Sequence, residues 1–116
     1  MGPLSGIKII EFAGLGPGPF CGMVLADMGA DVIVVDRIEN YGREKTNDLA
    51  SRGKKSIAVD LKNPDSKELI HELIENADAV LEGLRPGKME KLGYGPDNLL
   101  KICLLYTSTL PTKVRV

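Results

Sequence analysis

Tryptophan is absent from this chain of 116 residues, and aromatic residues make up only 4% of it. Proteins that bind single-stranded nucleic acid by stacking need aromatic platforms, so the composition argues against that class. The net charge is -1, so no general field attracts nucleic acid or an anionic membrane. No apolar run has the length of a membrane span. The composition therefore predicts a protein with neither nucleic-acid nor membrane partners.

Cysteine is scarce as well, because Cys21 and Cys103 are the only two. Two distant thiols do not make the framework of a disulfide-rich secreted domain. The first residues lack the basic stretch followed by an apolar stretch that marks a signal peptide. We therefore expect free thiols, a cytoplasmic location and one globular core.

A strand, a turn, a helix and a second strand are predicted between Gly6 and Arg37. Residues 6–12 and 31–36 are β-branched runs, and residues 14–19 are dense in glycine and proline. Gly29 has the place of a glycine that ends a helix. The helix is expected over residues 20–28, with an apolar stripe made of Phe20, Cys21, Val24, Leu25 and Met28.

The same alternation continues along the chain. We expect a strand over 56–61, a helix that starts with Asn63 as its N-cap, a strand over 78–81 and short helices after Pro86 and Gly95. The apolar stripe of the long helix consists of Leu69, Ile70, Leu73, Ile74 and Ala77. This order predicts an α/β fold with a Rossmann-like parallel sheet and helices on both faces. Ligands of such sheets bind beyond the carboxyl ends of the strands.

The first candidate site is the turn before the first helix. Glycine lets a ligand approach the backbone, and free N–H groups at a helix start suit phosphate or carboxylate. We therefore expect a substrate cleft at Gly16, Pro17 and Gly18, although a tight turn without a ligand explains the same residues. The turn departs from the dinucleotide pattern G-x-G-x-x-G because Pro19 has the last position. NAD remains an alternative, since Asp36 ends the second strand.

The second candidate site is a basic stretch. Seven lysine or arginine residues lie between Arg37 and Lys62, against four acidic residues. An arginine side chain binds phosphate through two parallel hydrogen bonds. Arg37 follows a buried strand directly, so its position is fixed, whereas a single lysine of a polar loop is ordinarily just solvated. Arg85 and Lys88, in the turn after the fourth strand, are a third candidate.

Other chemistry-bearing residues do not form a recognisable site. His71 is expected on the polar face of its helix, and Cys21 in the core. Glu11 ends the first strand and either faces the cleft or simply ends the strand. The pattern contains no metal-ligand cluster and no pair of a nucleophile and a base, so we predict no metal site.

Several blocks resemble family III of the coenzyme A (CoA) transferases, the CaiB/BaiF type, in the same order along the chain. The blocks are Gly6–Glu11, Gly16–Val32, Asp36–Arg37, Arg52–Ser56, Asp60–Lys62, Arg85–Gly87 and Met89–Gly93. The resemblance covers Gly2 to about Ile102 and is greatest to the racemase members, which invert the α-carbon of 2-methylacyl-CoA. One block alone would be weak evidence for the family, whereas the set of blocks in this order is specific to it.

The resemblance implies a large Rossmann-like domain that binds acyl-CoA, a smaller second domain and an interlocked homodimer. By position, Arg37 and the residues Val59, Asp60, Leu61 and Lys62 would contact the adenosine and phosphate part of CoA. Arg85 would line the same cleft. No prosthetic group is implied, because CoA enters as part of the substrate.

The expected parent protein is therefore an acyl-CoA α-carbon racemase, which removes and returns a proton at the α-carbon. A family III transferase that moves CoA between carboxylates through an aspartyl-CoA thioester is one alternative. A non-catalytic nucleotide- or NAD-binding module is the other. Gly83 and Leu84 replace the Asn-Phe that usually precedes Arg-Pro-Gly in the family, which slightly favours a racemase.

We expect residues 1–102 to be the amino-terminal part of the CoA-binding domain. The family's catalytic His and Asp lie beyond the end of this chain, so the chain alone is expected to be inactive. Residues 103–116 are interpreted as a non-native tail, because Cys103–Ser108 matches the translation of a common transposon sequencing adapter. A genuine but divergent strand is the alternative.

Overall fold

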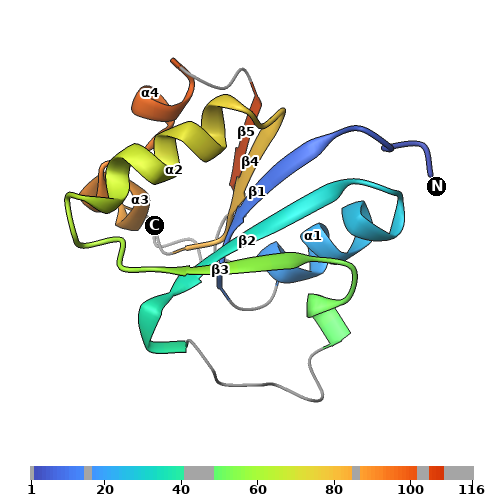
Figure 1. The fold of residues 1–116 in the computed structure, drawn as a ribbon. Helices are drawn as coiled ribbons and strands as arrows, with labels where there is room; N and C mark the ends of the chain where they lie inside the picture. Colours follow the sequence, from blue (N-terminus) through green and yellow to red (C-terminus); the bar gives the residue numbers. More distant parts are fainter. Residues whose placement is uncertain (1, 15–16, 41–48, 85–86, 102–104, 109–116) are drawn as a thin grey trace, which may run out of the picture.

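The computed structural model contains one five-stranded sheet in which all neighbouring strands run parallel (Figure 1). It describes residues 2–14, 17–40, 49–84, 87–101 and 105–108. The strand order β3-β2-β1-β4-β5 puts the first strand in the middle, and the predicted α/β fold with a parallel sheet is confirmed. The strands are β1 (Lys8–Phe12), β2 (Asp31–Arg37), β3 (Lys55–Val59), β4 (Ala79–Glu82) and β5 (Leu105–Ser108).

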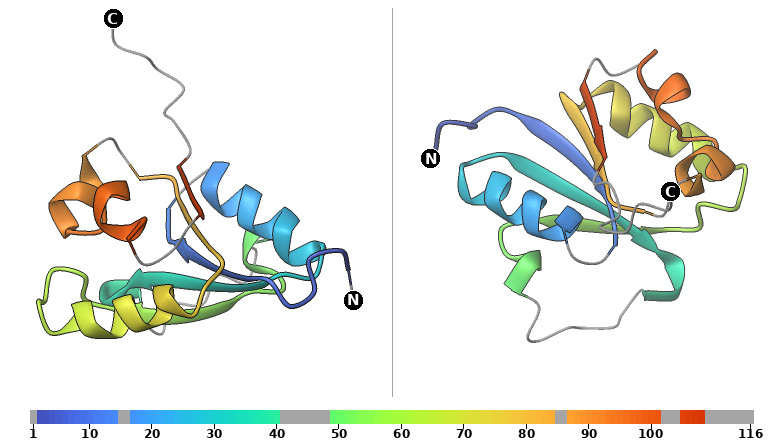
Figure 2. Two further views of the ribbon diagram at one scale, coloured as in Figure 1. Left: turned by 90° about the horizontal axis from the view of Figure 1, so that it is seen from above. Right: turned by 180° about the vertical axis from the view of Figure 1, so that it is seen from behind.

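Helices cover both faces of this sheet (Figure 2). The helix α1 packs on one face, and α2, α3 and α4 gather on the other. Two short 3-10 turns, η1 and η2, belong to the connection between β2 and β3. The bounds are α1 (Pro17–Asp27), η1 (Ile38–Asn40), η2 (Leu49–Ser51), α2 (Ser66–Glu75), α3 (Lys88–Leu92) and α4 (Pro96–Leu99).

Each face of the sheet has its own core. On the α2 side, Ile10 and Phe12 of β1 pack with Ile70 and Ile74 of α2, and all four are at most 1% exposed. On the α1 side, Ile9 of β1 packs with a second group of buried residues. The alternation along β1 follows from the two-residue period of a strand, so consecutive residues serve opposite cores.

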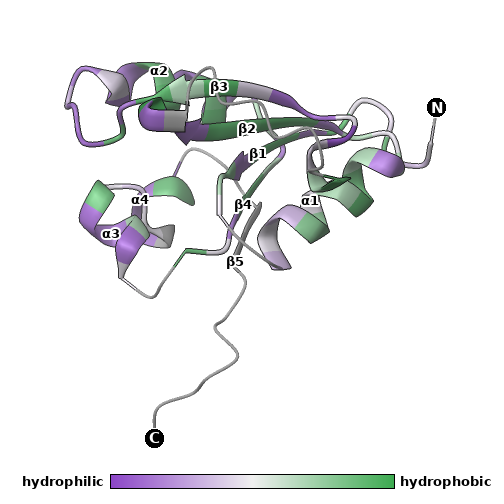
Figure 3. Ribbon diagram, turned by 90° about the horizontal axis from the view of Figure 1, so that it is seen from below, coloured by the Kyte–Doolittle hydropathy of each residue, from purple (hydrophilic) through white to green (hydrophobic). Residues whose placement is uncertain are grey.

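The predicted stripe of α1 is confirmed only in part, because Cys21 and Leu25 pack against the core but the two ends of the stripe do not. Phe20 is 61% exposed and Met28 43%, whereas Gly18 and Gly22 are buried. In Figure 3, green and pale colours follow one another along most of α1, so its apolar residues do not mark a single stripe. The helix turns its glycines toward the sheet, since they allow the closest approach. The helix also starts at Pro17 instead of Phe20, with both prolines in its first turn.

The helix α2 starts later than expected. Asn63 acts on the preceding turn, where its side-chain oxygen accepts a hydrogen bond from the N–H of Asp65 at 3.0 Å. Regular helix begins at Ser66. Leu69 was predicted to be buried but is 47% exposed, whereas Ile70 is fully buried. The stripe is therefore narrower than predicted and centres on Ile70 and Ile74.

Gly93 ends α3 as predicted, with a φ of 85° that favours glycine. The N–H of Tyr94 donates to the carbonyl of Met89 at 2.8 Å, which completes a glycine-based helix cap. The cap directs the Tyr94 side chain into the core, where it is fully buried. The predicted start at Pro86 lies outside the described residues, and α3 begins at Lys88.

Part of the segment predicted to be a non-native tail forms the edge strand β5. Leu105–Ser108 pairs in parallel with β4. Strand pairing uses backbone groups, so an extended segment of many sequences can occupy a sheet edge. The strand therefore does not distinguish a native segment from a foreign one, and the origin of residues 103–116 stays a prediction. Among the described residues, no helix is long and apolar enough to cross a membrane.

Candidate functional site

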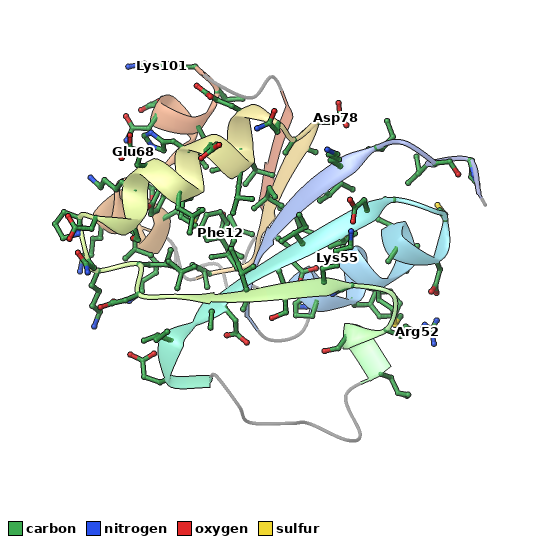
Figure 4. The ribbon with its side chains drawn as sticks, viewed as in Figure 1. Phe12, Arg52, Lys55, Glu68, Asp78 and Lys101 are labelled. Carbon is green, nitrogen blue, oxygen red and sulfur yellow. The ribbon has the colours of Figure 1, made fainter. Side chains whose placement is uncertain are left out.

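A cavity of about 380 Å³ lies at the carboxyl ends of β1, β2 and β3, on the side of α2 and α3. Its floor is apolar, and Figure 4 shows Phe12 of β1 at the centre of this side of the sheet. The position agrees with the rule that parallel sheets bind ligands beyond the carboxyl ends of their strands. Its lining residues are Phe12, Ala13, Val35, Arg37, Glu39, Val59, Asp60, Leu61, Lys62, Leu84, Lys88 and Leu92.

Most of the predicted binding residues that the structure describes meet in this cavity. Arg37 is the last residue of β2, and the segment from Val59 to Lys62 begins with the last residue of β3. These two segments are adjacent because β2 pairs with β3, so that Arg37 lies opposite Val59 in the register. The carboxyl ends of neighbouring parallel strands thus bring together residues that are far apart in the sequence.

The other predicted site residues have different positions. Arg85 and Gly16 lie outside the described residues. Pro17 is exposed and Gly18 is buried, and neither lines the cavity. A Cβ atom at Gly18 would lie 3.6 Å from Cα of Gly83, so α1 begins directly against the chain that leaves β4. The tight-turn interpretation therefore accounts for Gly18.

The mouth of the cavity carries three cations and two carboxylates. The cations are those of Arg37, Lys62 and Lys88, and the carboxylates those of Glu39 and Asp60. An oxygen of Asp60 accepts a hydrogen bond from the backbone N–H of Lys62 at 3.1 Å, so this acid shapes the turn. An apolar floor beside exposed cations suits a flat ring that carries phosphate groups.

Sequence reasoning missed the apolar floor of the cavity. Val35 comes from the buried strand predicted over residues 31–36, Leu84 from the turn after the fourth predicted strand, and Leu92 from the short helix α3. Lys88 was noted as a source of charge but was not assigned to the CoA site. The sequence did contain a signal for this floor, namely the last apolar residue of each predicted strand. Such residues on one face of a parallel sheet come together at its carboxyl edge.

The turn from β1 into α1 adjoins the cavity through Leu84. A Cβ atom at Gly14 would lie 3.8 Å from Cδ2 of Leu84, and Leu84 itself lines the cavity. The backbone N–H of Leu84 donates to a carboxylate oxygen of Glu82 at 2.9 Å. Glu82 is 6% exposed at the end of β4, so this hydrogen bond fixes the chain between the cavity and the turn.

A second buried carboxylate lies on the opposite face of the sheet. Glu11 of β1 pairs with Lys54, whose Nζ lies 2.8 Å from Oε1. Their side chains are 2% and 3% exposed, respectively. The sequence left open whether Glu11 faces the cleft, and the structure places it beneath α1, away from the cavity.

Two pKa shifts have clear physical causes. Burial raises the pKa of the Tyr94 phenol. The hydrogen bond from Arg52 lowers the pKa of Asp27, where Nη2 lies 2.6 Å from Oδ2 on the surface. Neither group lines the cavity. His71 is exposed, as predicted, and its ring forms a T-shaped pair with the ring of Tyr94.

The described residues offer no metal centre, because no group of three histidine, cysteine or acidic side chains among them could hold an ion. Cys21 has a free thiol and packs partly buried against the core on the α1 side. Cys103 lies outside the described residues.

The fold and the cavity define an α/β protein with a cavity at the carboxyl edge of its parallel sheet. The model of CoA-transferase family III matches residues 4–103, and the chain belongs to this family. The chain is 46% identical to the alpha-methylacyl-CoA racemase of Mus musculus over 98 residues, which cover 84% of this chain and 25% of the relative.

Two further comparisons lead to transferases and to a solved structure. A protein of Mycobacterium tuberculosis named as a probable fatty acyl-CoA transferase is 40% identical over 113 residues, which cover 84% of this chain and 28% of the relative. A crystal structure of a Mycobacterium tuberculosis protein superposes with a TM-score of 0.82 at 40% identity, covering 95% of this chain and 34% of the other. The chain thus spans about a quarter of the length of the curated relatives it matches.

Proposed function

We propose that this chain supplies the nucleotide part of the acyl-CoA site of an α-carbon racemase that acts on 2-methylacyl-CoA. The observation that carries the proposal is the convergence of Arg37 and Lys62 at the mouth of one cavity. CoA bears a ribose 3′-phosphate and a pyrophosphate, which need fixed cations, and an adenine ring, which needs an apolar surface. CoA joins the protein as part of its substrate, without a prosthetic group.

In this proposal the cavity floor holds the adenine ring. Phe12, Val35 and Leu92 supply apolar surface there, and the cations of Arg37, Lys62 and Lys88 bind the phosphate groups. Arg85 remains a proposed additional ligand of the same cleft. We also retain Gly16 and Pro17 as residues near the thioester end, whereas Gly18 acts through the packing of α1 against Gly83.

The reaction at the α-carbon requires two groups on opposite sides of the substrate. One removes the α-proton to give a thioester enolate, and the other returns a proton from the opposite face. We expect these groups in the part of the relatives that extends beyond the matched segment, since the chain corresponds to about a quarter of them. The chain by itself is expected to catalyse no exchange of the α-proton.

A family III CoA transferase is the second candidate function. Relatives with either name match this chain, including the mouse racemase at 46% identity and the mycobacterial transferase at 40%. Both reactions require the enzyme to bind the nucleotide part of CoA, so the cavity serves either one. Gly83 and Leu84, in place of the usual Asn-Phe, favour the racemase.

The decisive experiment is a calorimetric titration of the chain with CoA, dephospho-CoA and NAD. We expect CoA to bind most tightly, and removal of the 3′-phosphate to weaken binding by about tenfold, because one charge-assisted contact is lost. Arg37→Ala should remove most of the preference for CoA over dephospho-CoA. Equal binding of NAD and CoA would instead support the nucleotide-binding module and overturn the proposal.

The oligomer and the location complete the proposal. We expect the parent protein to form an interlocked homodimer in the cytoplasm. The exposed apolar side chains of Phe20 and Leu49, at 61% and 74%, are surfaces that a partner subunit would cover. Sedimentation of the parent protein tests the dimer, and a monomer at micromolar concentration would contradict it.

A further inference from the structure

Glu82 is one of two buried acidic side chains in the described part of the chain, and the other is Glu11. Glu11 pairs with Lys54 at 2.8 Å, whereas none of the ion pairs among the described residues gives Glu82 a cation. Its partner is a backbone group instead, because the N–H of Leu84 donates to Oε2 at 2.9 Å. Burying a carboxylate is unfavourable unless its partners compensate for the lost water. A buried acid with this kind of partner therefore calls for a role beyond packing.

Glu82 lies beside the floor of the cavity, on the same face of the sheet. Glu11 of β1 is opposite Leu81 of β4 in the register. The next residues, Phe12 and Glu82, end these two strands and are therefore neighbours. Val80 packs in the core on the α2 side and Leu81 in the core on the α1 side. Since strand residues alternate, Glu82 returns to the α2 side, where Phe12 lines the cavity.

Leu84 is the residue through which Glu82 acts on the cavity. The side chain of Leu84 lines the cavity and packs partly buried against the core on the α2 side. Gly83 joins Leu84 to β4, and a glycine leaves the backbone freer than any other residue does. The helix α1 limits this glycine on one side, since a Cβ atom at Gly18 would lie 3.6 Å from its N and Cα atoms. The hydrogen bond from Leu84 to Glu82 spans the glycine and sets the direction in which the chain leaves β4.

We propose that Glu82 is a positioning residue for the base of the bound nucleotide, because it holds Leu84 as an apolar wall against the flat ring. This inference rests on the proposed function and extends it from the phosphate groups to discrimination between bases. A purine covers more apolar surface than a pyrimidine, so a wall in a fixed position favours the larger ring. Glu82 itself does not touch the ligand.

The first test compares adenosine 3′,5′-bisphosphate with uridine 3′,5′-bisphosphate, which carry the same phosphate groups on different bases. Calorimetric titration of the unmodified chain should show a preference of about tenfold for the adenosine compound, since its ring buries more apolar surface. Glu82→Met keeps the approximate size of the side chain and removes the hydrogen-bond acceptor. The preference should then fall below about threefold. Glu82→Gln retains an oxygen that accepts the same N–H, so it should keep the full preference.

The matched control is Glu75→Met, since Glu75 is an exposed acid at the end of α2 and is not among the residues that line the cavity. It should leave the preference unchanged. An equal loss of affinity for both bisphosphates in Glu82→Met, with the preference intact, would mean a general structural role and would overturn the proposal. Loss of the preference in Glu82→Gln would overturn it too, because the charge of Glu82 and not its hydrogen bond would then matter.

Hydrogen exchange tests the positioning without any ligand. The amide of Leu84 should exchange about tenfold faster in Glu82→Met than in the unmodified chain, while the amides of α2 stay unchanged. Glu82→Gln should keep the slow exchange, because it keeps the acceptor. An unchanged rate at Leu84 in Glu82→Met would show that Glu82 does not hold this residue, and the proposal would be wrong.

The proposed function and the role of Glu82 fail in different ways. If the unmodified chain binds neither bisphosphate, both fail. If it binds the two equally, or if Glu82→Met keeps the preference for adenosine, the nucleotide site stands and only the role of Glu82 is overturned. If Glu82→Met does not fold, Leu84→Ala removes the wall itself and should lower the preference in the same way. A full preference in Leu84→Ala would overturn the proposal.

Discussion

Gly22 of α1 lies so close to Glu11 of β1 that any side chain at position 22 would overlap the glutamate carboxylate. The helix can approach the sheet only because this position lacks a Cβ atom. The buried carboxylate in turn is acceptable only because Lys54 pairs with it. A glycine, an acid and a lysine from three separate segments thus determine one helix position.

This relationship predicts the effect of Gly22→Ala. We expect the free energy of unfolding to fall by about 1–3 kcal/mol, because overpacking forces α1 or the ion pair to move. Urea denaturation followed by circular dichroism measures the change. The matched control is Gly18→Ala in the same helix, where the nearest atoms lie at an ordinary 3.6 Å. Alanine should be tolerated there, and equal losses at the two positions would contradict the packing argument.

The two adjacent residues Leu69 and Ile70 test the orientation of α2. Ile70→Ala should lower the free energy of unfolding by about 2–5 kcal/mol, because it leaves a cavity in the core. Leu69→Ala should change it by less than about 1 kcal/mol, since Leu69 is 47% exposed. Denaturant titrations of both variants give the comparison. A larger loss for Leu69→Ala would restore the wider stripe expected from the sequence.

Tyr94 predicts a loss of stability at alkaline pH. Burial raises the pKa of its phenol in the folded chain above the ordinary value. The unfolded chain therefore loses this proton first, and stability that is complete below about pH 10 is lost as the pH rises further. Tyr94→Phe removes this proton, so its unfolding midpoint should depend less on pH above about 10. If the unfolding midpoints of the two chains changed with pH in the same way, the assignment of this effect to Tyr94 would be refuted.

Lys88 tests the cations at the mouth of the cavity. We expect Lys88→Ala and Lys62→Ala each to weaken CoA binding by about tenfold, because each removes a proposed charged contact with a phosphate group. The control is Lys101→Ala, since Lys101 is exposed beyond α4 and does not line the cavity (Figure 4). Calorimetric titration with CoA gives the dissociation constants of the three variants for comparison. Full affinity in the Lys88 variant would remove this residue from the proposed site.

The sequence alone was sufficient to predict the fold class, the order of the strands and α-helices from β1 to α4, and Arg37 as a residue at a strand end. These features depend on local chemistry: β-branched runs favour strands, glycine with positive φ ends a helix, and a strand–helix alternation leads to a parallel sheet. Gly29 and Gly93 mark the helix ends that the structure contains, with φ values of 102° and 85°. The resemblance to family III added the segment from Val59 to Lys62 to the predicted CoA site.

Only the tertiary structure decided which side of α1 is buried and where Glu11 points. Nearly every side of α1 is apolar, so the periodicity of the sequence could not show which side faces the sheet. In the structure the side with Gly18 and Gly22 faces the sheet, because these glycines fit against Gly83 and Glu11. The pairing of Glu11 with Lys54 joins residues that no spacing rule connects. Contacts of this kind depend on the shapes of surfaces that meet after folding, and a linear pattern does not contain those shapes.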